Sequence, residues 1–430
     1  MIDSKALIAI RAEHDLSQAA FADRLGYKVS YIQALEDHTN KREQATSSFI
    51  SKLRDEFGLH DAPLTISETD KLTEDLHRWK DLIDYGEMQK AEEAMPDLAK
   101  RAKLSFRRCL QCLYDLYAAR YYQNTGDKRP YKRLMKSLSE RQPEFTEICS
   151  FLYHHLVAVQ AHTENRLHDA HAAFDKAERI DKEDKWGGLP FCYQYGICLS
   201  YMGYAAKAIG YLERAMHKAK WSTGHDGKIN RRYDLHILCV LAKEYSKIGR
   251  MDDAIAILDE RFKYDTKRGT TSALGFIYHS YGEIYHKMED YGYALDNYEE
   301  AFKYHEEGSE PYIDSLFHKA ITLIACDMID EALDCISKGM RSSRGEVWKA
   351  LFDALKHSVS LSDPASLEYM EKVAIPNLLK HGQYEEATSH HEKICKFYEH
   401  RGNHKKAYEH IRAMYNIQKK QYEDRVERGV

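Results

Sequence analysis

The sequence has 430 residues, is 43% hydrophobic and 30% charged, and carries a formal net charge of −5. This composition is typical of a folded chain with two or three domains and excludes an intrinsically disordered protein. The acidic balance also excludes a polybasic nucleic-acid binder, so any DNA contact has to come from a local patch. We find no signal peptide and no apolar segment long enough to span a membrane, and nine scattered cysteines fit a reducing compartment, so we expect a cytoplasmic protein.

Residues 1–60 are predicted to form four or five short helices. Ser17 can cap the second helix, which runs to Leu25, and Gly26 makes the corner that follows. The third helix is expected from about Lys28 to Asp37. The stretch "ATSSFISKLRDEFGL" supplies a closing helix that ends at Gly58.

The second and third helices have the spacing of a helix-turn-helix. The pattern requires a small residue, a glycine and a branched apolar residue at fixed positions, and the sequence supplies Ala22, Gly26 and Ile32. The small residue lets two helices cross closely, and the glycine permits the turn. The apolar positions that fix the crossing angle are occupied by Phe21, Leu25 and Leu35.

This segment resembles the lambda-repressor-like (Xre-type) DNA-binding domain in "LSQ", "FADRLG" and "SYIQALE". It departs from the usual form at Lys28, where a serine cap is usual, and at Val29, where a basic residue is common. The resemblance implies that Gln18 contacts a phosphate and that Lys41 and Arg42 hold the DNA backbone. The residues it places at the major groove or its walls are Lys28, Ser30, Tyr31 and Gln33.

The charge of residues 1–60 leaves an alternative open. This segment holds eight Lys and Arg against nine Asp and Glu, which is unfavourable for tight DNA binding by one copy. One hypothesis is therefore a degenerate helix-turn-helix that makes protein contacts. The other is double-stranded DNA binding by a homodimer, in which two heads on a palindromic operator add their contacts.

The polar stretch "HDAPLTISETD" predicts a domain boundary. We assign residues 1–60 to the head, 61–70 to a linker and 71–430 to a repeat array. Units such as "YQYGICLSYMGYAAKAIGYLERAMHKA" resemble the tetratricopeptide repeat, which has small residues where the two helices of a repeat touch. Candidates for the first small position are Ala119, Ala158, Gly196, Ala242, Gly282 and Ala320, and Tyr131 and Ile375 break the small-residue rule in their repeats.

The expected fold class is therefore all-α, with a lambda-repressor-like head followed by a right-handed superhelix of about nine helical hairpins. In such a superhelix the first helix of each repeat lines a concave wall, and polar and aromatic groups on it suit the capture of an extended peptide. The alternative is a merely solvated wall. The residues predicted to face inward are Arg120, Gln123, His155, His162, Tyr193, Ser200, His236, Lys243, Ser246, His279, Glu283, His286, Asp314 and Phe317.

The sequence gives no indication of an enzyme. It contains none of the phosphate-binding, nucleophile-elbow or zinc-protease motifs. His390 and His391 precede Glu392 without completing a zinc set, and "CLQC" (Cys109, Cys112) has no second pair. We therefore expect no cofactor, no metal site and no catalytic residues.

The combination of an Xre-like head and a long-period repeat array resembles the peptide-pheromone receptors of the Rap/Rgg/NprR/PrgX/PlcR type (RRNPPA), with length and repeat number most similar to the NprR type. This resemblance implies a transcriptional regulator for quorum sensing that binds a short signalling peptide and acts as a homodimer on DNA. The alternative is a Rap-like switch that sequesters a response regulator or another protein. A phage lysis–lysogeny receptor would have the same architecture.

Overall fold

The computed structural model describes residues 2–37, 45–164, 166–221, 231–268, 271 and 273–426. These residues are helical apart from turns and one isolated bridge between Ile2 and Thr65. The predicted all-α class is thus confirmed for the described part of the chain. The described residues fall into two compact units, the first ending at Phe191 and the second beginning at Cys192.

Four short helices begin the first unit: α1 (Ser4–Glu13), α2 (Gln18–Leu25), α3 (Val29–Glu36) and α4 (Ser47–Phe57). They enclose a small apolar core in which Phe21, Leu25, Ile32 and Phe49 are fully buried. The predicted caps are present. The Ser17 hydroxyl accepts a hydrogen bond from the backbone N–H of Ala20 at 3.1 Å, and Gly26 ends α2 with a φ of +68°.

The segment predicted as a linker, residues 61–70, is structured. Ala62 and Leu64 are buried in the core of the four short helices, and the N–H of Asp3 donates to the carbonyl of Leu64 at 2.8 Å. Helix α5 begins at Ile66, behind a capping box formed by Thr65 and Glu68. The segment is polar on average, but its apolar residues Ala62 and Leu64 pack in the core of the head.

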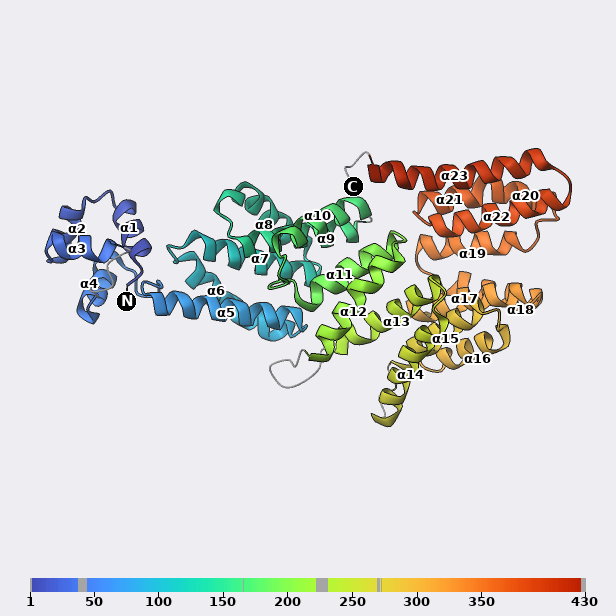
Figure 1. Cartoon of the computed structure of the whole chain (residues 1–430), viewed down its shortest axis with the longest axis horizontal. Coiled ribbons are helices and arrows are strands. Elements are labelled where there is room, and N and C mark those ends of the chain that lie inside the picture. Colours follow the sequence, from blue (N-terminus) through green and yellow to red (C-terminus); the bar gives the residue numbers. More distant parts are fainter. Residues whose placement is uncertain are drawn as a thin grey trace. The chain divides into compact units, whose positions relative to one another are not determined.

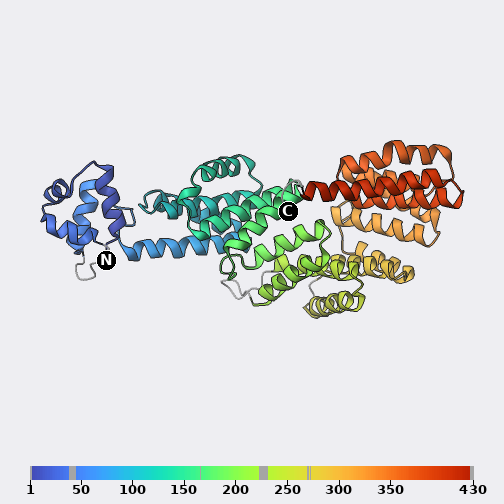
Figure 2. The same ribbon diagram turned by 45° about the horizontal axis from the view of Figure 1, so that its top comes forward.

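The rest of the described chain forms hairpins of consecutive helices (Figures 1 and 2). The helices are α5 (Ile66–Asp84), α6 (Met88–Lys103), α7 (Arg108–Thr125), α8 (Lys128–Glu140), η1 (Gln142–Glu144), α9 (Glu147–Thr163), α10 (Leu167–Ile180), α11 (Gly188–Tyr201), α12 (Ala205–Trp221), α13 (Arg231–Lys247), α14 (Met251–Arg268), α15 (Leu274–Lys287), α16 (Tyr291–Phe302), α17 (Glu310–Ala325), α18 (Ile329–Ser342), α19 (Glu346–Ser358), α20 (Pro364–Tyr369), η2 (Met370–Ala374), α21 (Ile375–Lys380), α22 (Tyr384–His400) and α23 (His404–Val426).

Small residues stand where the helices of a hairpin approach closely, as the repeat pattern predicts. A Cβ at Gly282 on α15 would lie 2.5 Å from the ring of Tyr298 on α16. A Cβ at Gly196 would lie 2.9 Å from Leu212 in the same way. Among the candidates for the first small position, Ala119, Ala158, Ala242 and Ala320 are fully buried. Close packing between helix pairs is therefore encoded at these positions.

Two exceptions to the small-residue rule are accommodated differently. Tyr131 is buried on α8, and its hydroxyl donates to the carbonyl of Leu156 at 3.3 Å. Ile375 follows the π-helical segment η2 and precedes Pro376 in an irregular second helix made of α20, η2 and α21. Proline removes one backbone donor, and the wider turn before it absorbs the change.

Among the described helices, none combines the length and the apolar character needed to cross a bilayer.

Candidate functional site

In the second unit, the first helices of three successive hairpins, α13, α15 and α17, pack side by side. We call the polar face that they share the first-helix surface. Of the side chains predicted to face inward, Lys243, His279, Glu283 and Asp314 meet on this surface. His318 of α17 joins them. These five residues are called the charged cluster.

The charged cluster is a continuous network of opposite charges. Lys243 Nζ donates to Glu283 Oε1 at 3.1 Å. Both imidazoles then lie between the same two carboxylates: His279 Nε2 is 3.5 Å from Asp314 Oδ2, and His318 Nε2 is 3.4 Å from Asp314 Oδ1. The network therefore connects all three helices of the first-helix surface.

Helical spacing explains why these side chains converge. His279 and Glu283 are four residues apart on α15, and Asp314 and His318 have the same spacing on α17. Residues four apart lie on one face of a helix, so each helix presents one imidazole and one carboxylate. The side chains of Lys243 and Asp314 are 44% and 40% exposed, which leaves them accessible to a ligand.

Burial and charge act in opposite directions on the pKa values of the cluster. For Glu283, burial raises the pKa, but the charges of Lys243, His318 and His279 outweigh it and hold the pKa well below its ordinary value. For His318, burial lowers the pKa, but the hydrogen bond to Asp314 and the charge of Glu283 raise it overall. His279 has a lowered pKa because burial outweighs the nearby carboxylates. The ionisation of each group in the cluster thus depends on its charged neighbours.

Hydrogen bonds between first helices continue the surface beyond the cluster. The hydroxyl of Thr322 is 2.9 Å from His286 Nδ1. Lys287 Nζ donates to the hydroxyl of Ser246 at 3.1 Å. Both pairs join neighbouring hairpins, so the predicted residues His286 and Ser246 hold the surface together.

Three residues predicted to face inward are buried instead, and these expectations are corrected. Arg120 on α7 is 3% exposed and its Nε donates to Asp84 at 2.5 Å, so it is not available to a peptide. His155 is buried among aromatic rings, including Phe151. Phe317 packs against Phe352. In each case the side chain is buried against another residue of the protein.

The remaining predicted residues are partly exposed. In the first unit, Gln123 donates to the carbonyl of Leu156 at 3.2 Å, and His162 is half-buried on α9. In the second unit, the hydroxyl of Tyr193 is 2.8 Å from His236 Nδ1. The hydroxyl of Ser200 donates to Glu244 at 2.8 Å. These contacts again link successive first helices.

The sequence analysis missed His318 and Glu244. His318 follows Phe317, which was chosen in its place, and a shift of one residue turns a side chain by about 100° around the helix. The four-residue spacing from Asp314 was the signal that could have identified it. Glu244 is fully buried and forms an ion pair of 2.8 Å with Lys247. Nothing in the local sequence indicates that this glutamate is buried.

The second candidate site is the exposed face of α3 in the head. Lys28, Val29, Ser30 and Gln33 are exposed there. Tyr31 is partly withdrawn, because its ring packs on Phe49 and its hydroxyl accepts from the N–H of Thr46. The predicted backbone contacts Lys41 and Arg42 lie outside the described residues.

Contacts within the head occupy part of this face. Gln18 donates to Glu36 at 2.7 Å, and Gln33 donates to Gln18 at 3.4 Å. Arg11 also binds Glu36, at 2.8 Å. A phosphate at Gln18 would therefore compete with an existing carboxylate contact.

The head is fastened to the first repeats. Arg107, before α7, donates to Asp3 at 2.6 Å, and Lys100 on α6 pairs with Asp61 at 2.9 Å. The bridge between Ile2 and Thr65 adds backbone pairing. The head, α6 and the segment before α7 are thus in direct contact.

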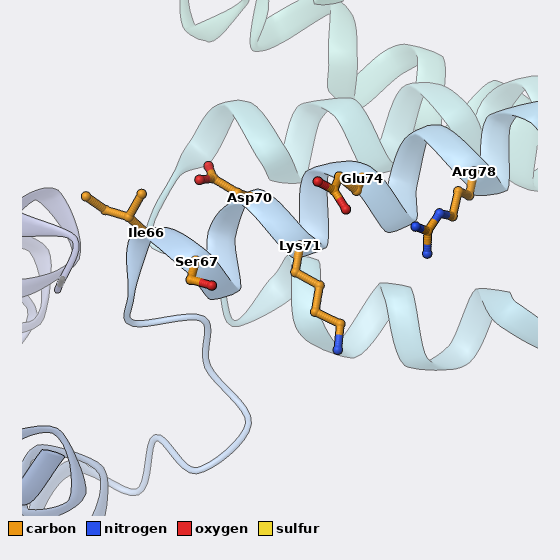
Figure 3. Close-up of a pocket in the computed structure, with 6 residues that line it drawn as sticks. All are labelled: Ile66, Ser67, Asp70, Lys71, Glu74 and Arg78. Carbon is orange, nitrogen blue, oxygen red and sulfur yellow. The ribbon is translucent and has the colours of Figure 1, made fainter.

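A shallow pocket lies elsewhere, along one face of α5 (Figure 3). Figure 3 shows its charged side chains, among them Lys71, Glu74 and Arg78, directed outward from a single helix. No residue from another helix lines it. It contains none of the predicted site residues and lacks the convergence of the charged cluster.

Comparisons with known proteins show which fold carries these sites. No protein-family model and no curated protein matches the sequence. The apo form of the quorum sensor NprR from B. thuringiensis superposes with a TM-score of 0.66 at 17% identity, covering 81% of this chain and 99% of that one. A Rap protein in complex with Competence and Sporulation Factor gives 0.66 at 14% identity, covering 83% and 100%. NprR in complex with its cognate peptide NprX gives 0.61 at 17% identity, covering 81% and 99%.

The chain has the fold of the NprR and Rap proteins. The two are matched with the same TM-score of 0.66, so the comparison does not favour one type over the other. The predicted architecture of tetratricopeptide-like hairpins is confirmed at this level. The DNA-binding role of the head remains a prediction.

Proposed function

We propose that the protein is a peptide-responsive regulator that binds a short peptide on the first-helix surface of its second unit. The charged cluster is the observation that carries this proposal. It holds a partly exposed ammonium, Lys243 on α13, and a partly exposed carboxylate, Asp314 on α17, and α15 contacts both of these helices. NprR, which has this fold, has been solved in complex with its cognate peptide NprX.

The chemistry of the cluster suits the charged groups of a peptide. Lys243 can exchange Glu283 for a peptide carboxylate, and Asp314 can receive a peptide ammonium or a basic side chain. Both side chains are paired within the cluster, so binding replaces existing ion pairs.

The proposal extends to the head, which we assign to DNA binding. The supporting features are the exposed Lys28, Ser30 and Gln33 on α3 and the αL turn at Gly26. The contacts of Asp3 and Asp61 with the first repeats provide a physical connection between array and head. A peptide that binds one shape of the array more tightly than another would shift the population toward that shape. The position of the head would change with it.

The peptide proposal is tested by affinity selection from a library of short random peptides. Wild-type protein is expected to enrich a small set of peptides, and Lys243→Ala/Asp314→Asn is expected to lose that enrichment. Lys319→Ala, whose lysine pairs with Glu299 on α16, is the matched control. Equal enrichment by all three proteins would contradict the proposal.

A Rap-like protein switch is the second candidate. Two observations favour it. The head has no excess of positive charge, and the Gln18–Glu36 and Gln33–Gln18 contacts occupy part of its proposed DNA-binding face. Electrophoretic mobility shift with the DNA upstream of the protein's own gene separates the two functions. Absence of binding, with and without a selected peptide, would favour the switch.

A further inference from the structure

Four potential metal ligands converge on the first-helix surface, two from each of two helices. His279 and Glu283 come from α15, and Asp314 and His318 come from α17. Among the described residues, the ligand atoms of His279, Glu283 and His318 all lie within 4.8 Å of one another. The sequence search for metal motifs missed this set because its members are divided between two repeats.

The separations between the ligand atoms approach those around a four-coordinate zinc ion. Bonds of about 2.0–2.2 Å at tetrahedral angles place neighbouring ligand atoms about 3.4 Å apart. His318 Nε2 is 3.4 Å from Asp314 and 3.7 Å from Glu283. His279 Nε2 is 3.5 Å and 3.7 Å from the same two carboxylates. The separations between histidine and carboxylate atoms are thus within a few tenths of an ångström of those around an ion. The two imidazoles face different oxygens of each carboxylate, so binding one ion also requires the carboxylates to turn.

A buried hydroxyl sets the orientation of one imidazole. Ser315 is fully buried, and its hydroxyl donates to the carbonyl of Pro311 at 2.9 Å. It therefore accepts from His279 Nδ1, which is 2.9 Å away. This places the proton on Nδ1 and directs the lone pair of Nε2 toward the two carboxylates. An Nε2 lone pair that faces carboxylates can bind a metal ion together with them, and such an outer hydrogen bond is typical of metal-bound histidine.

Lys243 is the competing cation. Its ammonium binds Glu283 Oε1, while Oε2 of the same carboxylate faces His279. Because the lysine side chain is 44% exposed, it can turn toward solvent or keep Oε1 as an outer contact.

We propose that His279, Glu283, Asp314 and His318 form a binding site for a divalent transition-metal ion, with zinc as the best fit. Two imidazoles and two carboxylates suit zinc in donor type and number. A bound ion would fasten α15 to α17 and so stiffen the first-helix surface. The site shares Asp314 with the proposed peptide site, so a bound ion would withdraw this carboxylate from a peptide ammonium. The metal inference is tested with metal alone, and its outcome is therefore read separately from peptide binding.

The test is a titration of the full chain with Co²⁺, followed by displacement with Zn²⁺. The protein is first stripped with a chelator and kept reduced, since nine cysteines offer alternative ligands. One Co²⁺ per chain is expected, with visible absorption of a four-coordinate ion and no thiolate-to-metal charge-transfer band. Zn²⁺ should displace it.

Variants identify the ligands. His318→Ala and Glu283→Gln are expected to weaken metal binding at least about 100-fold, and Ser315→Ala about 10-fold. His286→Ala is the matched control. His286 lies on α15, as Glu283 does, but its imidazole contacts Thr322 and is not part of the proposed ligand set. Circular dichroism confirms that each variant is folded. No stoichiometric binding, a thiolate band, or equal weakening by His286→Ala would each overturn the proposal.

Discussion

Lys243 on α13 and Glu283 on α15 form an ion pair of 3.1 Å between the first helices of successive hairpins. The lysine is partly exposed, whereas the glutamate also faces two imidazoles: His318 Nε2 lies 3.7 Å from Oε1, the oxygen that Lys243 binds, and His279 Nε2 lies 3.7 Å from Oε2. The two partners therefore differ in role. Glu283 organises the surface, and Lys243 is the member that can leave the pair for a ligand.

The pairing of Lys243 leads to the first prediction. Lys243→Ala should weaken binding of a selected peptide by about 10- to 100-fold, because a charge-assisted hydrogen bond contributes about 1.5–3 kcal/mol. Isothermal titration calorimetry measures this loss. Lys319→Ala should bind as wild type, and unchanged affinity in Lys243→Ala would remove the lysine from the proposed site.

The buried pair between Arg120 and Asp84 leads to a prediction about stability. Arg120→Ala should lower the free energy of unfolding by about 3 kcal/mol, because it leaves a buried carboxylate with Lys80 as its remaining ion-pair partner. Arg179→Ala removes an exposed pair with Asp175 and should cost less than about 1 kcal/mol. Urea unfolding compares the two, and equal effects would contradict the assigned burial of Arg120.

Close approach at Gly282 predicts opposite effects for two glycine substitutions. Gly282→Ala places a Cβ 2.5 Å from the Tyr298 ring and should destabilise the fold by about 1–3 kcal/mol. Gly292→Ala lies in α16 with open space around the added Cβ and should stabilise it by about 0.4–1 kcal/mol. Thermal unfolding measures the sign of the stability change for both variants. An unchanged stability in Gly282→Ala would mean that α15 and α16 are packed less closely than described.

His390 on α22 predicts loss of stability in acid. It is 5% exposed and no hydrogen-bond partner of its Nδ1 is found among the described residues. Burial lowers its pKa to about 3. The unfolded chain therefore binds the proton first, and stability falls as the pH drops below about 6.5, levelling off near the folded pKa. From pH 7 to 5 the loss is about 2 kcal/mol.

Urea unfolding at the two pH values tests this prediction. In His390→Leu the loss between pH 7 and pH 5 should be about 2 kcal/mol smaller than in wild type. His404→Ala, which changes an exposed histidine at the start of α23, should keep the wild-type dependence. An unchanged dependence in His390→Leu would show that this histidine is not the titrating group.

The head carries a prediction about DNA. Lys28→Ala/Gln33→Ala should abolish the mobility shift of the upstream DNA, because both residues lie on the exposed face of α3. Lys5→Ala, an exposed residue on α1, should leave the shift unchanged. A shift that survives the double change would place DNA contact elsewhere.

Local patterns were sufficient to predict much of the fold. Ser17 and Gly26 cap and end α2 as expected, because caps depend on a few neighbouring residues. Gly282 marked a close helix contact from its place in the repeat. Side-chain direction was less predictable, since Arg120 is turned by Asp84, which stands 36 residues earlier. His318 and Phe317 differ by one helical step, which the repeat register alone could not resolve.

Calorimetric titration of Lys243→Ala/Asp314→Asn with a peptide selected by wild type tests the central claim most directly. The claim is that the charged cluster on the first-helix surface is the peptide site. It predicts that the double variant remains folded and loses binding by at least about 100-fold, while Lys319→Ala retains it. Wild-type affinity in the folded double variant would contradict the claim.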